Sequence, residues 1–220
     1  MQENNSGDEA EEAPVSQFKV ILFDVGGVLL TNGWDRTERA EVFARFGIDK
    51  EDYETRQREA YVAWDTGRIT AREFQDSTIF YKPRAFSREQ FWQAVLDQSQ
   101  LLPGGAMGIL EELAASNRYL LGALNNEPRE TNEYRFEHFG LNRLLRVRLS
   151  SCYLGLHKPD LPFYRRALDI LGCRPEQVLF IDDRVENVAA AVEAGISALR
   201  FEGAEKLRPE LEALGVLEPR

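Results

Sequence analysis

The chain has 220 residues, of which 43% are hydrophobic, and it carries a formal net charge of −10 at pH 7. This length and composition suit one sizeable domain, or a core domain with a smaller insertion. The negative charge argues against a general nucleic-acid binder, because phosphate backbones select clustered Lys and Arg. It leaves open a small anionic substrate, which responds to the local site and not to the net charge.

The sequence also argues against secretion and membrane insertion. Cys152 and Cys173 fit a reducing compartment, and no metal-ligand spacing links them. No run approaches the roughly 18 apolar residues of a membrane span, and the N-terminus lacks the basic start and apolar stretch of a signal peptide. We therefore expect a cytoplasmic protein with no membrane or nucleic-acid partner, as a monomer or a homodimer.

Residues 1–17 are polar and acidic. Such a segment has too little apolar surface to bury, so we expect a disordered acidic tail. After it, apolar runs alternate with amphipathic segments. We predict strands at 19–23, 119–124, 146–150, 177–181 and 196–201, and helices that include 107–116, 162–171 and 186–194. Strands alternating with helices predict an α/β fold with a parallel, Rossmann-like sheet flanked by helices, whose ligands bind beyond the carboxyl ends of the strands.

A long interruption separates the first two predicted strands, at about residues 32–98. It is rich in helix formers and aromatic residues and lacks strong strand patterns. An insertion of this length is too structured for a loop, so we predict a helical cap over the edge of the sheet, with most of its aromatic residues in its own core. The expected division is a tail at 1–17, a Rossmann-like core at 18–31 and 99–220, and a helical cap at 32–98.

Polar residues of suitable kinds follow four of the predicted strands. Asp24 follows the first strand, Asn125 and Asn126 the second, Lys158 the third, and Asp182 and Asp183 the fourth. Each alone has a structural explanation, because a strand-end Asp often caps a turn and paired Asp residues often cap a helix. The order and placement of all four favour one shared site.

The charges of these residues suit the transfer of a phosphoryl group to a carboxylate. Asp24 and Asp183 offer hard oxygen ligands for Mg²⁺, which prefers one or two carboxylates together with water and phosphate. Lys158 and the cation would offset the charge of a phosphate that approaches an anionic nucleophile. The amides of Asn125 and Asn126, and the backbone N–H groups of the Gly26-Gly27 turn, would donate hydrogen bonds to phosphoryl oxygens.

At this point four motifs in order resemble the haloacid dehalogenase-like hydrolase superfamily over about residues 20–201. They are Phe-Asp24-Val-Gly-Gly-Val-Leu, then Leu-Gly-Ala-Leu-Asn125-Asn126, then His157-Lys158-Pro159-Asp160, and finally Leu-Phe-Ile-Asp182-Asp183-Arg184-Val-Glu186-Asn187. The resemblance implies a Rossmann-like core, a helical cap inserted after the first motif, and Mg²⁺ as cofactor.

The resemblance also implies roles for individual residues. Asp24 resembles the nucleophile that forms an aspartyl-phosphate, and Lys158 would steady both it and the phosphate. For the metal, it implies Asp24, the backbone carbonyl of Gly26, and Asp183 as ligands. Asp182 and Asn187 would support the metal-bound waters. Asn125 stands where the family usually has Ser or Thr.

The main departure is Gly26, where phosphatases of the family usually place a second Asp that protonates the leaving oxygen and then activates water. Loss of a general acid/base costs on the order of 10²–10⁴ in rate. Three outcomes stay open. Another group substitutes, for example Asp35 or Glu38; or the substrate has a good leaving group; or the chain is catalytically weak. A phosphatase-like branch of the family also has glycine here, so Gly26 does not itself imply inactivity.

The sequence therefore predicts a Mg²⁺-dependent phosphatase acting on a small phosphorylated metabolite through an aspartyl-phosphate on Asp24. One alternative is a metal-free 2-haloacid dehalogenase, against which the Asp182-Asp183 pair argues. The other is a non-catalytic binding or regulatory protein with the same fold. His157 and the cap-entrance residues Asn32, Trp34 and Arg36 are candidates for substrate contacts, although a structural role also suits them.

Overall fold

The structure is a computed structural model that describes residues 16–219, so most of the predicted tail lies outside the described residues. Its strands are β1 (Val20–Phe23), β2 (Leu120–Asn125), β3 (Val147–Ser150), β4 (Val178–Asp182) and β5 (Ser197–Arg200). Its helices are α1 (Arg36–Phe46), α2 (Lys50–Asp65), α3 (Ala71–Thr78), α4 (Arg88–Leu96), α5 (Met107–Ser116), α6 (Arg129–His138), α7 (Leu141–Leu144), α8 (Ser151–Leu154), α9 (Leu161–Leu171), α10 (Val185–Glu193) and α11 (Ala204–Ala213), and Pro175–Gln177 forms a short 3₁₀ helix.

The five strands form one parallel sheet in the order β3-β2-β1-β4-β5. Val20 of β1 pairs with Leu120 on one side and with Val178 on the other. The prediction of a parallel α/β sheet is confirmed, and each strand begins one residue later than the sequence indicated. The chain builds outward from β1 to β3 and then crosses back to β4, so the β1–β4 boundary is the switch point where open α/β sheets bind ligands.

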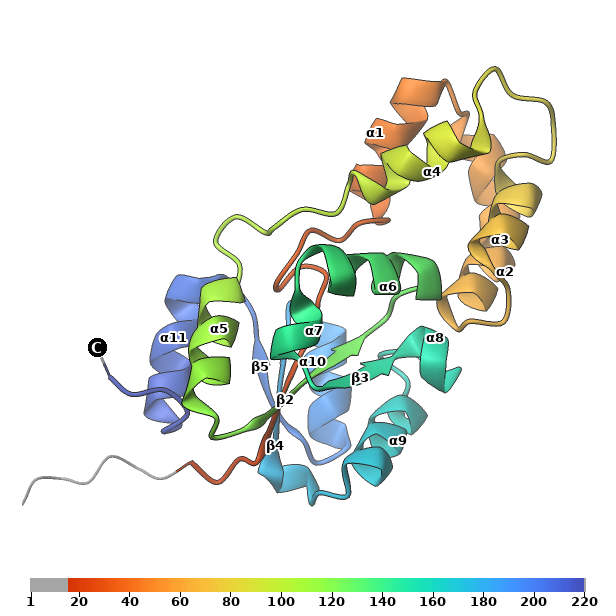
Figure 1. Cartoon of the computed structure of the whole chain (residues 1–220). Helices are drawn as coiled ribbons and strands as arrows, with labels where there is room; N and C mark the ends of the chain where they lie inside the picture. The colour runs from red at the N-terminus through yellow and green to blue at the C-terminus, as the bar shows by residue number, and fades with distance from the viewer. Residues whose placement is uncertain (1–15, 220) are drawn as a thin grey trace, which may run out of the picture.

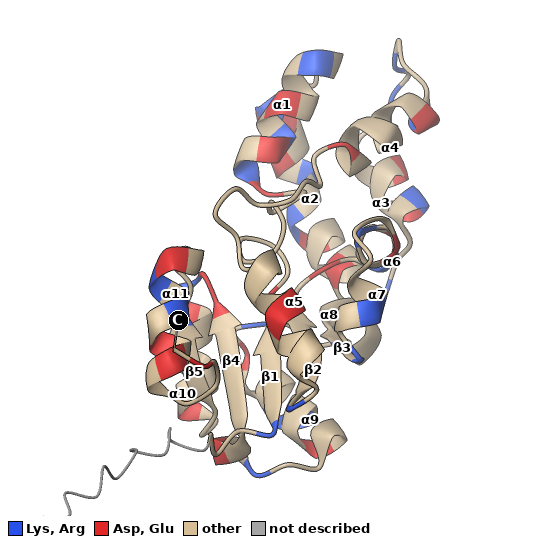
Figure 2. Cartoon of the chain, turned by 60° about the vertical axis from the view of Figure 1, so that its left-hand side comes forward, with Lys and Arg blue, Asp and Glu red and all other residues tan. Residues whose placement is uncertain are grey.

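Helices cover both faces of the sheet (Figure 1). Alternate residues of β1 supply the two cores, because successive side chains of a strand point to opposite faces. Ile21 and Phe23 pack in a cluster with residues of α5, α6, α7 and α11. Val20 and Leu22 pack in a second cluster with residues of α9 and α10. The strands β1 and β2 contain no charged residue, and Figure 2 shows the charges gathered on the helices.

Helices α1 to α4 lie together beyond the carboxyl edge of the sheet (Figure 1). They share their own hydrophobic cluster, to which the aromatic residues of the insertion contribute as expected. Trp64 and Phe74 stack at its centre, with ring centroids 4.4 Å apart. Capping boxes begin two of these helices, with Thr70 and Glu73 at α3 and Ser87 and Gln90 at α4.

The two segments that join this helical layer to the sheet run side by side. The Thr31 N–H donates to the carbonyl of Gln100 at 2.9 Å, and the Leu102 N–H donates to the carbonyl of Leu29 at 3.1 Å. This paired connection directly follows the turn that carries Asp24 and Gly26, so the path into the helices starts at the candidate site. Within residues 16–219, no helix is both long enough and apolar enough to span a bilayer.

Candidate active site

The carboxyl ends of β1, β2 and β4 converge on a cavity of about 300 Å³. Its lining comes from both the sheet edge and the helical layer. It includes Asp24, Gly26, Asn126, Lys158 and Asn187 from the predicted site, together with Asp65 from the end of α2. The parallel sheet therefore brings Asp24, Asn126 and Lys158 to one cavity, and Asp182 and Asp183 lie beside Asp24 although they do not line it.

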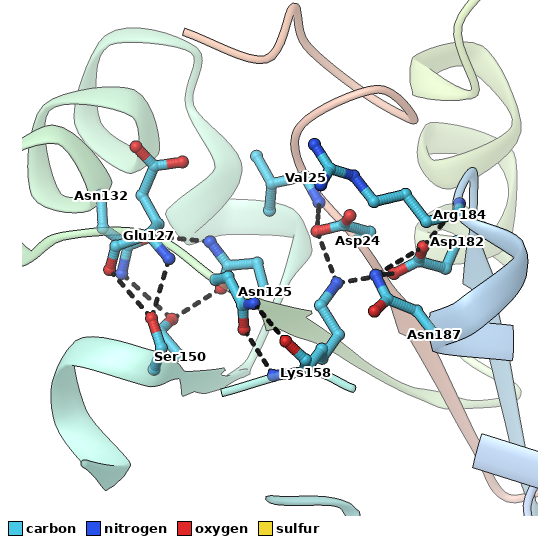
Figure 3. Close-up of polar contacts among 12 residues, drawn as sticks. Asp24, Val25, Asn125, Glu127, Asn132, Ser150, Lys158, Asp182, Arg184 and Asn187 are labelled. Carbon is cyan, nitrogen blue, oxygen red and sulfur yellow. Dashed lines mark hydrogen bonds and ion pairs between the residues drawn. The ribbon is translucent and has the colours of Figure 1, made fainter. Parts of the chain in front are cut away.

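Lys158 links two carboxylates at the centre of this site (Figure 3). Its Nζ lies 3.0 Å from Oδ1 of Asp24 and 2.6 Å from Oδ2 of Asp182, and the lysine side chain is almost fully buried. Burial lowers the pKa of Lys158, but the two facing carboxylates outweigh it and raise the pKa above the ordinary value. Lys158 is therefore held as a cation between the first and fourth motifs.

The two oxygens of Asp24 differ in their surroundings. Oδ1 accepts the contact from Lys158 and a hydrogen bond of 2.8 Å from the N–H of Val25. Oδ2 has no hydrogen-bond partner among the described residues, and it is the oxygen free to meet a ligand. Burial and the charges of Asp182 and Asp183 raise the pKa of Asp24 to about 7, against the opposing charge of Lys158.

Asp182 is fully buried and its oxygens are occupied by donors of the protein. Besides Lys158, it accepts from the backbone N–H of Arg184 at 2.8 Å and from Nδ2 of Asn187 at 3.0 and 3.1 Å (Figure 3). Asn187 is in turn fixed by Tyr164, whose hydroxyl donates to its carbonyl at 2.9 Å. Asp182 therefore orients the lysine and the start of α10.

Asp183 has the opposite character, because its Oδ1 is buried without a hydrogen-bond partner among the described residues. Burial, followed by the charge of Asp182, raises its pKa. Carboxylate oxygens of Asp24, Asp182 and Asp183 lie within 4.8 Å of one another. An orphaned carboxylate oxygen in a cluster of three is a donor set that fits a hard divalent cation such as Mg²⁺.

Gly27 makes room for this cluster. Its φ is +76°, and a Cβ atom on it would lie 2.5 Å from Oδ2 of Asp183. Any side chain would therefore displace the carboxylate. Its N–H donates to the carbonyl of Leu30 at 2.8 Å, so in this structure that group is not free for the phosphate contact expected from the sequence.

The side chain of Asn125 lies in a buried polar network and not in the cavity lining. Its Nδ2 donates to Oδ1 of Asn132 at 3.1 Å, and its Oδ1 accepts from Oγ of Ser150 at 2.7 Å (Figure 3). Asn132 also donates to Oγ of Ser150 at 3.1 Å, which closes the ring. The network ties the ends of β2 and β3 to α6, and the phosphate contact of Asn125 stays a prediction.

Asn126 lines the cavity but uses its amide on Lys158. Its Oδ1 accepts from the backbone N–H of Lys158 at 2.8 Å, and its Nδ2 donates to the carbonyl of the same residue at 2.9 Å. The second motif thereby positions the backbone of the third.

A family model for haloacid dehalogenase-like hydrolases matches residues 18–195, which is most of the chain. The chain belongs to this family. The resemblance inferred from the four motifs is therefore confirmed, and the Rossmann-like sheet agrees with it.

Relatives of this haloacid dehalogenase-like hydrolase include two proteins whose names describe the hydrolysis of phosphate esters. Flavin mononucleotide hydrolase 1 of Arabidopsis thaliana is 29% identical over 97% of this chain and 83% of its own length. A sesquiterpene phosphatase of Aspergillus oryzae is 26% identical over 84% of this chain and 90% of its own. Among solved structures, a family enzyme of Bacteroides thetaiotaomicron in complex with magnesium and inorganic phosphate matches with a TM-score of 0.68 and 22% identity, over 85% of this chain and 96% of that one.

The haloacid dehalogenase-like hydrolase departs from the usual first motif at Gly26, and the structure fills the space beside it. A Cβ atom on Gly26 would lie 3.1 Å from Oδ1 of Asn32 and 3.8 Å from Nη1 of Arg135. Arg135 is fully buried, pairs with Glu127 at 2.5 Å and donates to the carbonyl of Thr31. The side-chain amide oxygen of Asn32 and the guanidinium of Arg135, which is paired with Glu127, thus lie beside the Cβ position of residue 26.

Several lining residues were not indicated by the sequence. Asp65, Tyr61 and Arg39 come from the helical layer, and Glu127 follows the second motif directly. Glu127 had a local signal, because it comes directly after a strand-end motif. Asp65 had none, since it ends a helix far from every motif and reaches the site only through the packing of that helix on the core.

The other candidates are divided by the structure. His157, Asn32 and Trp34 line the cavity, and Arg36 does not. Asp35 also lines it, but one of its oxygens accepts from the N–H of Arg36 at 2.7 Å and the other from Arg184 at 2.9 Å. Glu38 is half-buried on α1, outside the lining.

Proposed function

We propose that the chain is a Mg²⁺-dependent phosphatase that hydrolyses a small phosphorylated metabolite through an aspartyl-phosphate on Asp24. One observation carries this proposal. Asp24 has one oxygen held by Lys158 and Val25 and the other free, at the switch point of the sheet, beside the unpartnered oxygen of Asp183. A carboxylate fixed on one side and open on the other suits a nucleophile that must attack along one line.

The chain's own residues would do most of the work. Lys158 would lower the repulsion between Asp24 and an incoming phosphate, because it is a buried cation that contacts the nucleophile. Asp182 would keep Lys158 in place, and Asn126 would hold its backbone. The N–H groups near Gly26 and the amide of Asn125 stay as proposed phosphate contacts.

Asp24, the carbonyl of Gly26 and Asp183 would hold the Mg²⁺, with Asp182 and Asn187 supporting its waters. When bound, the ion would supply charge neutralisation for the phosphoryl oxygens. The unpartnered Oδ1 of Asp183 supports this assignment, because a buried carboxylate oxygen without a donor is costly unless a cation meets it. Removal of the ion with a chelator should abolish turnover.

The substrate class is proposed from the cavity and the relatives. A volume of about 300 Å³ suits one small organic phosphate. Two relatives are named as a flavin mononucleotide hydrolase and a sesquiterpene phosphatase, so phosphate esters of quite different organic groups occur among them. The segment 32–98 would act as a cap that selects the organic group, since it supplies Trp34, Arg39 and Tyr61 to the lining.

The decisive test compares wild type with Asp24→Asn on a panel of phosphorylated metabolites in excess Mg²⁺. We expect turnover in the wild type and none in the variant, and a phosphorylated Asp24 trapped from the wild type by rapid quenching and mass spectrometry. Turnover that persists in Asp24→Asn would overturn the proposal.

Two control measurements separate the alternatives. Release of halide from 2-haloacids that survives EDTA would identify a dehalogenase, which attacks carbon without a metal. Binding of phosphorylated ligands without turnover of any of them would identify a binding protein that keeps the fold.

A further inference from the structure

Asp65 is a buried carboxyl group that the proposed phosphatase site does not yet use. It is the last residue of α2, is 5% exposed, and lines the same cavity as Asp24. Its Oδ1 is buried and has no hydrogen-bond partner among residues 16–219. Native proteins leave few buried polar atoms unpaired, and those at a cavity wall are candidates for contact with a ligand.

The core of the protein holds this end of α2 in a fixed place. Oγ of the buried Ser151 donates to the carbonyl of Asp65 at 2.8 Å. Gly67 follows with φ +70°, packed so closely on the carbonyl of Cys152 that a side chain there would clash. The backbone around Asp65 is therefore seated on α8, beside the third motif.

A second anchor comes from Glu130 on α6. Its Oε2 accepts from Nε1 of Trp64 at 3.0 Å, and its Oε1 accepts from the N–H of Ala71 at 2.7 Å. The carboxylate of Glu130 thus binds both Trp64, the residue before Asp65, and the first residue of α3. Asp65 belongs to the inserted helices by sequence and to the active site by position.

The charged and titratable groups that face Asp65 come from several elements. Glu127, His157 and Lys158 approach it from the core, and Tyr61 lies one turn earlier on its own helix. Burial, followed by the charge of Glu127, raises the pKa of Asp65 to about 6, while a hydrogen bond from Ser151 and the charges of His157 and Lys158 oppose the rise. A carboxyl with a pKa near neutrality can both give and take a proton under ordinary conditions.

The other carboxyl groups in or beside the lining fit a proton-transfer role less well. Glu186 lines the cavity but is exposed to solvent in the first turn of α10. Both oxygens of Asp35 accept hydrogen bonds, from Arg36 and Arg184. Glu127 is paired with the buried Arg135 at 2.5 Å. Asp182 is fully engaged, and Asp24 and Asp183 belong to the nucleophile and the proposed metal site. Among the described residues that line the cavity, Asp65 combines a buried, unpaired carboxylate oxygen with a place outside the metal cluster.

We propose that Asp65 is the general acid and base of this site and takes the place of the carboxyl that Gly26 lacks. This inference rests on the proposed phosphatase function. It adds a catalytic residue from the inserted helices, which no strand-end motif indicates.

The proton transfers balance over the two steps. First, an oxygen of Asp24 forms a bond to phosphorus, the bond from phosphorus to the leaving oxygen breaks, and that oxygen takes the proton of the Asp65 carboxyl. Then the Asp65 carboxylate takes a proton from a water molecule whose oxygen bonds to phosphorus. The bond between Asp24 and phosphorus breaks, its electron pair returns to the carboxylate, and inorganic phosphate leaves. Asp65 ends protonated, as it began.

The test uses Asp65→Asn, with Glu59→Gln on the exposed face of the same helix as the matched control. An alkyl phosphate needs its leaving oxygen protonated, whereas p-nitrophenyl phosphate does not. We expect kcat for the alkyl phosphate to fall about 10²–10³-fold in Asp65→Asn, within the usual range for a general acid/base. With p-nitrophenyl phosphate, a burst of nitrophenol should remain, followed by slow turnover and accumulation of phosphorylated enzyme.

The pH profile supplies a second readout. In the wild type, kcat for the alkyl phosphate should fall above the pKa of Asp65, because the acid must be protonated, and this limb should be absent in Asp65→Asn. A rise in KM with unchanged kcat, or equal losses for both substrates without a burst, would overturn the inference in favour of a binding or structural role. Unchanged kinetics would overturn it as well.

The proposed function fails in a different way. A wild type inactive on both esters with Mg²⁺, or an active Asp24→Asn variant, would overturn the phosphatase and the role of Asp65 together. Loss of activity in Asp24→Asn with full activity in Asp65→Asn would overturn the role of Asp65 alone.

Discussion

A Cβ atom on Gly26 would lie 3.8 Å from Nη1 of Arg135, a guanidinium without solvent exposure. The space beside Gly26, where a second Asp is usual in the first motif, is therefore lined by polar side chains of the protein. Arg135 is already paired with Glu127, and Oδ1 of Asn32 lies 3.1 Å from the same Cβ position, so a side chain added at residue 26 would have to displace groups that are already in place.

The first prediction concerns a restored motif. Gly26→Asp should not raise kcat for an alkyl phosphate, because Asp65 is the proposed proton donor and because Oδ1 of Asn32 already lies 3.1 Å from the Cβ position, so the new side chain would have to displace it. Gly26→Ala measures the effect of the added volume alone, and both variants should turn over at or below the wild-type rate. A gain of about tenfold in Gly26→Asp but not in Gly26→Ala would show that the proton-transfer role is vacant.

The second prediction concerns the metal cluster. Gly27→Ala would place a methyl group against the Asp183 carboxylate, so the affinity for Mg²⁺ measured by calorimetry should fall about 10–100-fold, as for other changes that displace a ligand's support. The matched control is Gly47→Ala at the end of α1, where φ is +60° and nothing lies within 4 Å of the Cβ position. It carries the same kind of backbone strain and should leave Mg²⁺ affinity unchanged. Equal losses in both would refute a specific role of Gly27.

The third prediction concerns Lys158. Lys158→Met leaves the buried carboxylates of Asp24 and Asp182 facing each other without their cation. The free energy of unfolding should fall by about 3–5 kcal/mol, the usual result of breaking a buried ion pair from one side. Phosphate turnover should be lost as well. Lys206→Met removes an exposed lysine that pairs with Glu202, and it should change neither quantity measurably in urea titrations and kinetics.

The fourth prediction is a pH dependence of stability. The pKa of Asp65 is raised from 3.8 to about 6, so the folded protein favours its protonated form and loses stability as pH rises between these values. Asp65→Asn should therefore be more stable than wild type at pH 8, by at most roughly 3 kcal/mol, and the gain should vanish near pH 4. Urea unfolding at the two pH values measures it.

Asp52, on the same helix, should show the opposite dependence of stability on pH. Hydrogen bonds from Lys82 and Tyr81 lower its pKa, so its contribution to stability is present above its ordinary pKa and is lost as pH falls. Asp52→Asn should therefore be less stable than wild type at pH 8. A group that lowers the stability of the folded protein is typical of a functional site. If Asp65→Asn were instead less stable than wild type at pH 8, Asp65 would have a structural role.

The sequence predicted those parts of the site that depend on local order. An apolar run followed by a carboxylate places Asp24 and Asp183 at strand ends, and in a parallel sheet all such ends meet at one edge. The strands are only four to six residues long, but their apolar runs are clear, so their ends differ from expectation by no more than one residue. Lys158 was found in the same way, from its place beyond the third strand.

The remainder depends on contacts between distant segments. Asp65 reaches the cavity because Ser151 and Glu130 seat the end of α2 on the core, and neither contact leaves a mark in the local pattern. The hydrogen bonds of Asn125 to Asn132 and Ser150 were equally hidden, since they join three elements that the sequence predicts separately. Local sequence patterns predict the strand or helix on which a residue lies, but its side-chain contacts depend on how those elements pack.

The side-chain amide of Asn126 accepts from the backbone N–H of Lys158 and donates to its carbonyl. The facing residue of an antiparallel strand would make the same pair of hydrogen bonds. The side chain of Asn126, just after β2, thus makes two hydrogen bonds of the kind found between strands, to the backbone of Lys158, which lies outside the sheet. Only a group with a donor and an acceptor side by side can do this. An aspartate would set oxygen against the carbonyl of Lys158, and a serine would be too short. The identity of residue 126 therefore helps to fix the backbone from which the ammonium group of Lys158 reaches Asp24.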